Sequence, residues 1–383
     1  MKKVIIIIII AAILLVAFLA APYLSLLVPK AAYYVYKEIT YKTVSDSIAA
    51  NSEPPERVVI LFNNFFHENL FSPIGAKAID KDTYNDLVRG IGFCDQKAWG
   101  MSALLARRGI YSRMVMTTNP EGQSNHTVME AKIGGRWCFF DPQYGFVVRK
   151  ANGELASFND VCEDPSLILK SQAMLDIKKF DPASYDVIKG FFGSNIFYPN
   201  AKKPTIWDCP DNNKSFFRFL LAKELDLYVK IFGKKFAYTF QDIYLNMFAG
   251  KSGYNELFFR ARNYDIYGRH DLAVDYYVRF IKEFPLDPDQ DDALIFLGLL
   301  YTRAGEAGKA IDVLDHLLEV SPSTMWGPRA YYYLGCNYES QAEIEKAKDC
   351  YKKSIEMLRE QDGELAMVKL LELHSVSRLL ELR

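Results

Sequence analysis

The sequence has no excess of charge of either sign, and this absence argues against partners that are themselves strongly charged. Lys and Arg total 46 against 47 Asp and Glu in 383 residues, so the formal net charge is -1. Proteins that bind a nucleic-acid backbone need a basic surface to neutralise its phosphates. We therefore expect no nucleic-acid partner. The length predicts two or three globular domains.

Cysteine is sparse, and no two cysteines form a C-x-x-C pair. Dense or paired spacing is typical of disulfide scaffolds and zinc ribbons, so both are excluded. His67-Glu68 lacks the second His of the H-E-x-x-H zinc-protease motif. The sequence therefore predicts neither a metal nor a cofactor. The six cysteines are Cys94, Cys138, Cys162, Cys209, Cys336 and Cys350.

Charged residues are absent from residues 4–29. A helix of roughly 20 apolar residues crosses a bilayer, so this run predicts a single transmembrane helix over residues 1–29. The polar, Pro-rich run 51–56 predicts a juxtamembrane stalk over residues 30–55. A cleaved signal peptide is the alternative, although Ala20-Ala21 followed by Pro22 is a poor cleavage site.

The flanking lysines bear on the orientation of this predicted anchor. Lys2 and Lys3 favour a cytoplasmic N-terminus, which would place the globular part outside the cytoplasm. Lys30, Lys37 and Lys42 on the other flank favour the opposite orientation. The prediction is a single-pass membrane protein with its globular part extracytoplasmic.

The C-terminal third repeats with a period of 37 residues. The matching positions are Ala261, Gly298 and Gly335; Tyr264, Tyr301 and Tyr338; Ala273, Ala310 and Ala347; and Tyr277, Leu314 and Tyr351. Each unit has two amphipathic helices joined at Gly268, Gly305 or Ala342. Stacked units bury a shared apolar face. We expect three repeats over residues 251–362 and a capping helix over residues 363–383.

These units resemble the tetratricopeptide repeat. The resemblance rests on Leu294-x-x-Leu297-Gly298-x-x-Tyr301 and on the matching positions of the third unit. The family implies an all-α repeat domain with a groove that docks a protein partner. The alternative is a structural spacer whose groove is filled by the middle region of the chain itself.

One cysteine has a setting suited to chemistry. Gly90 and Gly92 free the backbone before Cys94, and apolar residues at helical spacing follow until Gly109. Cys94 is therefore expected at the start of a helix. There the helix dipole and unpaired N–H groups stabilise a thiolate, the reactive form of cysteine. The same N–H groups could hold an oxyanion.

Two β-rich runs on either side of Gly134-Gly135 predict a hairpin. If those glycines form the loop, the numbers of directly opposed residues sum to 269. His126 and Asp141 then lie on one face, on a diagonal of roughly 7–8 Å between Cα atoms. Asn152-Gly153 predicts a second hairpin, and Ser157 is suited to cap a short helix after it.

The segment around these residues resembles the transglutaminase-like cysteine enzymes, a branch of the papain-like fold. The resemblance rests on Gly92-x-Cys94, Gly109-Ile-x-x-Arg113, His126-x-x-x-Glu130, Gly135-x-Trp137 and Asp141-Pro142. It implies an α+β core over residues 56–170. It also implies Cys94 as nucleophile, His126 as base and Asp141 as its orienting carboxylate, with a thioester intermediate. Family members often carry an aromatic residue where this chain has Val128, which leaves the shielding of the site open.

The predicted fold class is thus an α+β papain-like transglutaminase core followed by all-α tetratricopeptide-type repeats, with an N-terminal transmembrane helix. Residues 171–250 are predicted to form a mostly helical connection. The expected function is hydrolysis or acyl transfer at an amide or peptide bond of a protein or peptide substrate. The alternative is a membrane-anchored interaction scaffold whose papain-like domain binds without catalysis.

Overall fold

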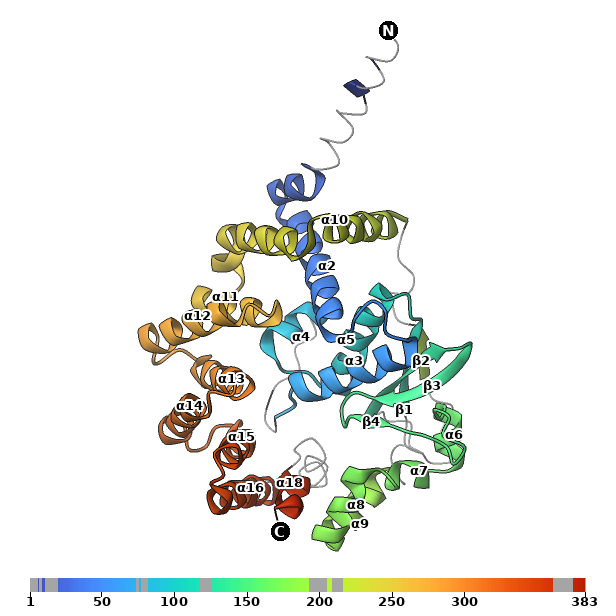
Figure 1. Ribbon diagram of the computed structural model, residues 1–383, viewed down its shortest axis with the longest axis vertical. Helices are drawn as coiled ribbons and strands as arrows, with labels where there is room; N and C mark the ends of the chain where they lie inside the picture. The colour runs from blue at the N-terminus through green and yellow to red at the C-terminus, as the bar shows by residue number, and fades with distance from the viewer. Residues whose placement is uncertain are drawn as a thin grey trace.

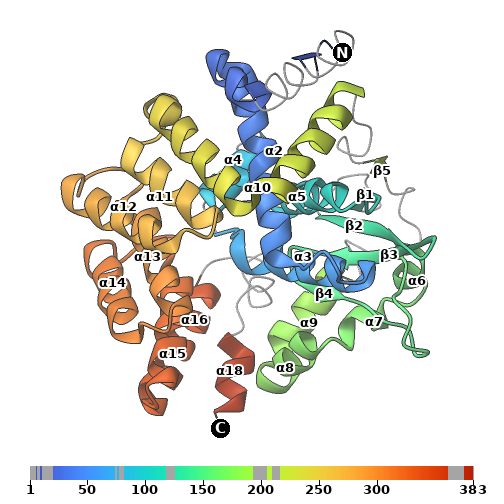
Figure 2. The ribbon, with the colours of Figure 1, turned by 45° about the horizontal axis from the view of Figure 1, so that its top comes forward.

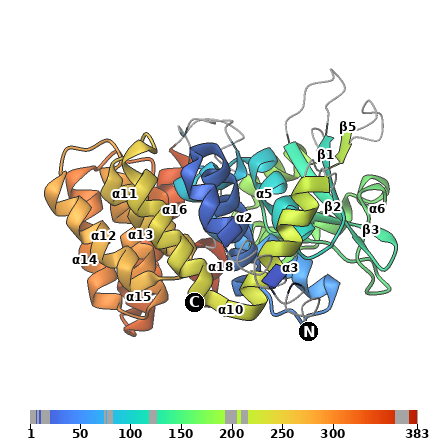
Figure 3. The ribbon, with the colours of Figure 1, turned by 90° about the horizontal axis from the view of Figure 1, so that it is seen from above.

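The computed structural model describes residues 6, 9–10, 20–73, 76, 82–117, 126–192, 205–208, 216–360 and 375–382. An α+β part with a five-stranded sheet lies on one side, and an arc of paired helices lies on the other (Figure 1). α2 and α10 run between the two parts (Figure 3).

The sheet is antiparallel with strand order β4-β3-β2-β1-β5. Its strands are β1 (Ser112–Thr117), β2 (His126–Ile133), β3 (Arg136–Asp141), β4 (Phe146–Val147) and β5 (Thr205–Asp208). Ile133 pairs with Arg136 and Met129 with Phe140, so the register that sums to 269 is confirmed. Gly134 and Gly135 both have positive φ, which a two-residue hairpin loop requires.

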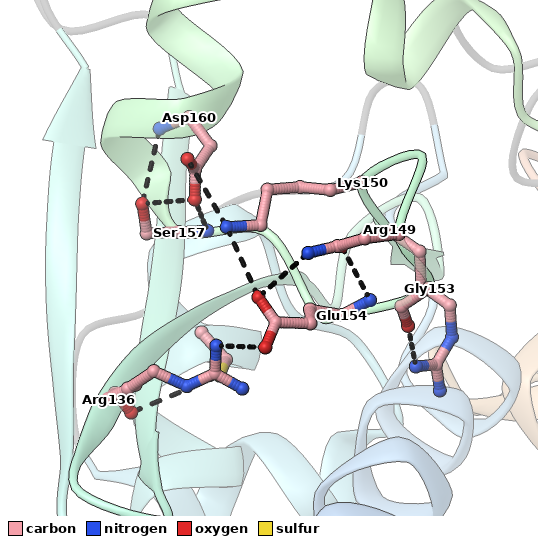
Figure 4. A network of polar contacts seen from close by, with 9 residues as sticks. Arg136, Arg149, Lys150, Gly153, Glu154, Ser157 and Asp160 are labelled. Carbon is pink, nitrogen blue, oxygen red and sulfur yellow. Dashed lines mark hydrogen bonds and ion pairs between the residues drawn. The ribbon is translucent and has the colours of Figure 1, made fainter.

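The second hairpin is also confirmed. An antiparallel bridge joins Arg149 to Leu155, Gly153 has φ +84°, and the Ser157 hydroxyl accepts a hydrogen bond from the Asp160 N–H. Figure 4 shows the polar side chains around this turn, including the 2.8 Å ion pair of Arg136 with Glu154. Both partners are largely exposed, so the pair contributes little to stability.

Three helices form the core beside the sheet: α2 (Pro29–Ile48), α3 (Pro55–Asn69) and α5 (Cys94–Arg107). α5 packs against β1 and β2, and α2 and α3 pack on α5. The expected stalk over residues 30–55 is therefore corrected, because α2 is part of the core. Tyr36 and Ile39 are fully buried, and the Arg107 guanidinium pairs with Glu38 at 2.6 Å.

The prediction of a membrane-spanning helix over residues 1–29 is also corrected. No helix in the described part of the chain is both long and apolar enough to cross a membrane. α2 has the necessary 20 residues, but it carries charged side chains such as Lys37 and Glu38 and is buried in protein. Most of residues 1–19 lie outside the described residues. The predictions of a single-pass membrane localisation and of the membrane as a partner depended on this helix, so they are corrected as well.

A series of helices connects the sheet to the repeats. It contains α6 (Phe158–Glu163), α7 (Ser166–Leu169), α8 (Gln172–Phe180), α9 (Pro182–Phe191), α10 (Phe216–Phe248) and the short η3 (Ala249–Lys251). α10 bends at Gly233, whose φ is +61°, and packs on α2. The short η1 (Ser25–Leu27) precedes α2, and α4 (Thr83–Arg89) precedes α5.

The repeats form three helix pairs that pack in sequence. They are α11 (Glu256–Ile266) with α12 (His270–Glu283), α13 (Gln290–Arg303) with α14 (Ala307–Val320), and α15 (Gly327–Ser340) with α16 (Ile344–Arg359). The predicted turn residues Gly268, Gly305 and Ala342 all have positive φ, the last at +60°. α18 (Ser375–Glu381) packs against α16, whereas the rest of the expected cap, residues 363–374, lies outside the described residues.

The arc of repeats curves around the α+β part, with α11, α13 and α15 facing it (Figure 1). The Tyr36 hydroxyl donates to Asn263 Oδ1 at 2.8 Å. At the other end α18 packs on α8 (Figure 2), and Arg359 pairs with Asp181 at 2.5 Å. The chain itself therefore covers parts of this inner surface, with α2 of the α+β part at one end and α8 and Asp181 of the connecting helices at the other.

Gly335 allows the two helices of the third repeat to approach closely. A Cβ at this position would overlap the ring of Tyr351, which is fully buried. We expect Gly335→Ala to lower the free energy of unfolding by about 1–3 kcal/mol, the usual range for overpacking. Urea denaturation measures the change. Gly308→Ala is the matched control, since nothing lies within 4 Å of its added Cβ; equal losses in both variants would contradict the prediction.

Candidate active site

Cys94 is the first residue of α5, as expected. Gln96 fixes this helix start, because its Oε1 accepts a hydrogen bond from the Phe93 N–H at 3.0 Å. Its Nε2 donates to Asp86 Oδ1 on α4 at 2.8 Å. Gln96 is 5% exposed and Asp86 4% exposed. This buried link holds the turn that carries the thiol.

His126 and Asp141 come from the two strands of the predicted hairpin. His126 begins β2 and Asp141 ends β3. His126 Nε2 lies 2.8 Å from Asp141 Oδ2, and the side chains are 2% and 0% exposed. The structure thus brings these two residues together on one face of the sheet, and the Asp141 contact leaves Nδ1 of the imidazole for another partner.

The other partner of His126 is the Cys94 thiol, to which it is hydrogen-bonded. Burial alone would raise the pKa of Cys94, but the hydrogen bond and charge of His126 lower it below the usual value for a thiol. Burial would likewise lower the pKa of His126, but the charge and hydrogen bond of Asp141, aided by Cys94, raise it to about 10. Both shifts favour the charged forms, a thiolate at Cys94 and an imidazolium at His126.

Cys94 differs in this respect from the other cysteines that the structure describes. Burial is the main cause that raises the pKa of each of the others, to about 11 for Cys162 and Cys350. Cys138 is buried, as expected for a structural residue. Among the described cysteines, only Cys94 has the environment of a reactive thiol.

Asp141 is oriented by the backbone that follows it. Its Oδ1 accepts hydrogen bonds from the N–H groups of Gln143 at 2.9 Å and Tyr144 at 3.2 Å. The turn after β3 thereby satisfies one carboxylate oxygen while His126 takes the other. A carboxylate held by three donors is fixed in direction.

Tyr144 supplies an aromatic cover that the sequence did not predict. Its ring centroid lies 5.2 Å from that of His126, and Phe192, the residue after α9, packs edge-on against Tyr144 at 5.5 Å. Val128, where family members often have an aromatic residue, is buried in the core. Tyr144 lies in a loop 18 residues after His126, so the alternation of side chains along the strands could not predict its contact with the imidazole.

A second group of buried polar residues, which sequence reasoning also missed, connects the segment before Cys94 with the turn after Asp141. The Ser72 hydroxyl donates to the Gly92 carbonyl at 2.7 Å and is 3.1 Å from Gln143 Nε2. The Gln143 carbonyl lies 3.0 Å from His67 Nδ1. His67 thus has a structural partner. The described residues contain no group of three or more His, Cys, Asp or Glu side chains that could hold a metal ion.

Comparison with known families identifies two regions of the chain. A model of the transglutaminase-like superfamily matches residues 42–142, and a tetratricopeptide-repeat model matches residues 328–358. The chain contains a transglutaminase-like domain. It also contains a tetratricopeptide repeat, so the predicted combination is confirmed. Neither a curated protein nor a solved structure matches the chain.

The transglutaminase-like domain match contains all three predicted site residues and ends directly after Asp141. It begins at Lys42, within α2, which agrees with the burial of that helix beside α5. The repeat match spans α15 and α16. Tetratricopeptide repeats mediate contacts between proteins or domains, and here the repeats contact the transglutaminase-like domain of the same chain.

Proposed function

We propose that the protein is a cysteine enzyme that hydrolyses an amide or peptide bond or transfers its acyl group to an acceptor. Cys94 is the nucleophile, His126 the base and Asp141 the orienting carboxylate. The observation that carries this proposal is the continuous contact from the half-buried Cys94 thiol through His126 to Asp141, with the buried 2.8 Å ion pair at its end. The substrate class is a protein or peptide.

The geometry supports a two-step reaction. The Cys94 sulfur attacks the substrate carbonyl carbon, and an oxyanion forms near the unpaired N–H groups at the start of α5. Protonated His126 then donates its proton to the leaving amine as the C–N bond breaks, which leaves a thioester. In the second step His126 takes a proton from water or an acceptor amine, and that nucleophile releases the acyl group from sulfur.

The identity of the acceptor decides between hydrolysis and acyl transfer. Water competes at any open thioester, so transfer requires a site that holds an amine beside Cys94. The buried His126 and its Tyr144 cover support a partly shielded thioester. Hydrolysis needs no further binding site. Transfer would be detected as a covalent product between the acyl group of the substrate and the amine.

The proposal is tested by alkylation of Cys94 with iodoacetamide, followed residue by residue with mass spectrometry. Because the pKa of Cys94 is lowered, we expect its rate to fall less between pH 8 and pH 6 than that of an ordinary thiol. An ordinary thiol slows roughly 100-fold over this interval. His126→Ala should restore that ordinary slope. Enzymatic turnover, in contrast to alkylation, should decrease as the pH rises through about 10, where His126 loses the proton that it donates to the leaving amine.

Cys350 provides the internal comparison, since its pKa is raised to about 11, and Cys350→Ala is the matched control for labelling. If Cys94 slows with falling pH as much as Cys350 does, or if His126→Ala leaves its rate unchanged, the enzyme proposal fails. A domain that binds without catalysis would then be favoured.

A further inference from the structure

Phe71, in the segment between α3 and α4, is held by side chains of the repeats. It is fully buried. The Arg329 guanidinium of α15 lies 3.7 Å from the centre of its ring, and Trp326 meets the ring edge-on with centroids 5.8 Å apart. Phe296 of α13 stacks on it with an interplanar angle of 18°. The transglutaminase-like domain thus places one of its residues in the core of the repeats.

The backbone of Phe71 is paired with the segment that leads to the nucleophile. Its N–H donates to the Gly90 carbonyl at 2.8 Å, and its carbonyl accepts from the Gly92 N–H at 2.9 Å. Cys94 follows two residues after Gly92. A displacement of Phe71 would therefore move the start of α5.

A second contact from the repeats reaches the same segment from α4. The buried Arg262 donates from Nε to the Val88 carbonyl at 2.5 Å and from Nη2 to the Leu87 carbonyl at 3.0 Å. These carbonyls lie at the C-terminus of α4, where a cation is favoured, and the Leu87 carbonyl also accepts from the Gly90 N–H at 3.3 Å. The end of α4 is therefore completed by the repeats, directly before Gly90.

Gly90 itself makes the close approach possible. It has φ +66°, and a Cβ there would overlap the Phe296 ring. Gly90-Ile91-Gly92 has much intrinsic conformational freedom because glycine restricts the backbone little. Contacts from outside the segment, from Phe71, Phe296 and Arg262, therefore have to fix its geometry.

We infer that Arg262, Phe296 and Arg329 of the repeats are positioning residues for Cys94. They hold residues 90–92 in the geometry that brings the thiol to His126. The inference rests on the proposed function, because it assigns a role to the repeats in the reactivity of that thiol. The repeats act through the segment before the nucleophile and not by contact with the reacting atoms.

The test uses the full chain with Arg329→Ala, because Arg329 is only half-buried and its loss leaves no buried charge unpaired. The readout is the ratio of the Cys94 alkylation rates at pH 6 and pH 9. We expect a fall of about five-fold or more, since small misplacements of reacting groups cost up to roughly 100-fold. Because an unfolded chain would present Cys94 as an ordinary thiol and would also lower this ratio, the rates are compared without denaturant, after urea denaturation has shown that the variant is folded. Arg279→Ala, which removes a cation above Tyr276 within the repeats, is the matched control.

Two more variants sharpen the result. Arg329→Lys keeps a cation over Phe71 and should recover much of the ratio, and Phe296→Leu should lower it from the side of Gly90. If Arg329→Ala and Phe296→Leu both match Arg279→Ala, the inference is overturned while the proposed function stands. If wild-type Cys94 has no reactive thiolate at pH 6, the proposed function and this inference fail together.

Discussion

Replacing Asp141 with alanine is expected to lower the free energy of unfolding by about 3–5 kcal/mol, the range for removing one partner of a buried ion pair. The variant leaves buried donors without acceptors at His126, Gln143 and Tyr144. It also removes the largest cause that raises the pKa of His126. We therefore expect the thiolate at Cys94 to be lost at pH 6 together with the stability.

The pH dependence of this loss has a defined sign. The folded-state pKa of His126 is raised from 6.5 to about 10, so its stabilising contribution is fully present below about pH 6.5 and declines as the pH rises to about 10. The difference between wild type and Asp141→Ala should be largest near pH 6 and smaller at pH 9. Urea denaturation at both values measures it.

Asp141→Asn is the control that separates charge from hydrogen bonding. Its carbonyl oxygen can still accept from the Gln143 and Tyr144 N–H groups, so we expect it to retain more stability than Asp141→Ala. It should nevertheless give Cys94 the steeper pH dependence of an ordinary thiol in alkylation, because the charge that holds the proton on His126 is gone. An Asp141→Asn protein with wild-type alkylation would contradict the role assigned to the carboxylate.

Trp326→Ala is expected to cost about 3–5 kcal/mol of unfolding free energy, the range for deleting a buried aromatic side chain. Trp326 is fully buried between the repeats and the transglutaminase-like domain, where it contacts Phe71 and Phe296. Its Nε1 also donates to Asp292 Oδ1 at 2.7 Å. The variant therefore leaves both a cavity and an unpaired carboxylate.

This loss should be greater at pH 8 than at pH 5. Burial raises the pKa of Asp292 to about 6, although the Trp326 hydrogen bond lowers it, and removal of that bond raises it further. A carboxyl with a raised folded-state pKa loses stability as the pH rises through it. Trp326→Phe keeps a ring but loses the donor, so it should show a similar pH slope with a smaller total loss. Thermal or urea unfolding at the two pH values is the measurement, and a pH-independent loss would contradict the assignment to Asp292.

The features that depend on nearby residues were predicted correctly from the sequence. The hairpin register follows from Gly134-Gly135 because side chains alternate strictly along strands, and this parity placed His126 beside Asp141. The helix start at Cys94 follows from the glycines before it. The repeat turns at Gly268 and Gly305 follow from a period that stacking imposes on every unit.

What sequence reasoning missed depends on partners far along the chain. The Pro-rich run 51–56 predicted a stalk over residues 30–55, and charges such as Lys37 and Glu38 gave no sign that α2 is buried. Those charges are satisfied by Asp82 and Arg107, which no local pattern connects to them. The Tyr144 cover and the Ser72 link were missed for the same reason. The predicted membrane helix came from apolar length alone, a criterion that no helix in the described part of the chain satisfies.

The contact between α2 and the repeats has a consequence for biosynthesis. The Tyr36 hydroxyl finds its acceptor in Asn263, 227 residues later, so it is synthesised long before its partner. At about 5–20 residues per second, the side of α2 that meets the first repeat stays uncovered for roughly 10–45 s on the ribosome, although α5 can already cover another side. The transglutaminase-like domain therefore completes its core only when the first repeat has emerged, and a chaperone that protects nascent α2 during this interval should raise the yield of folded protein.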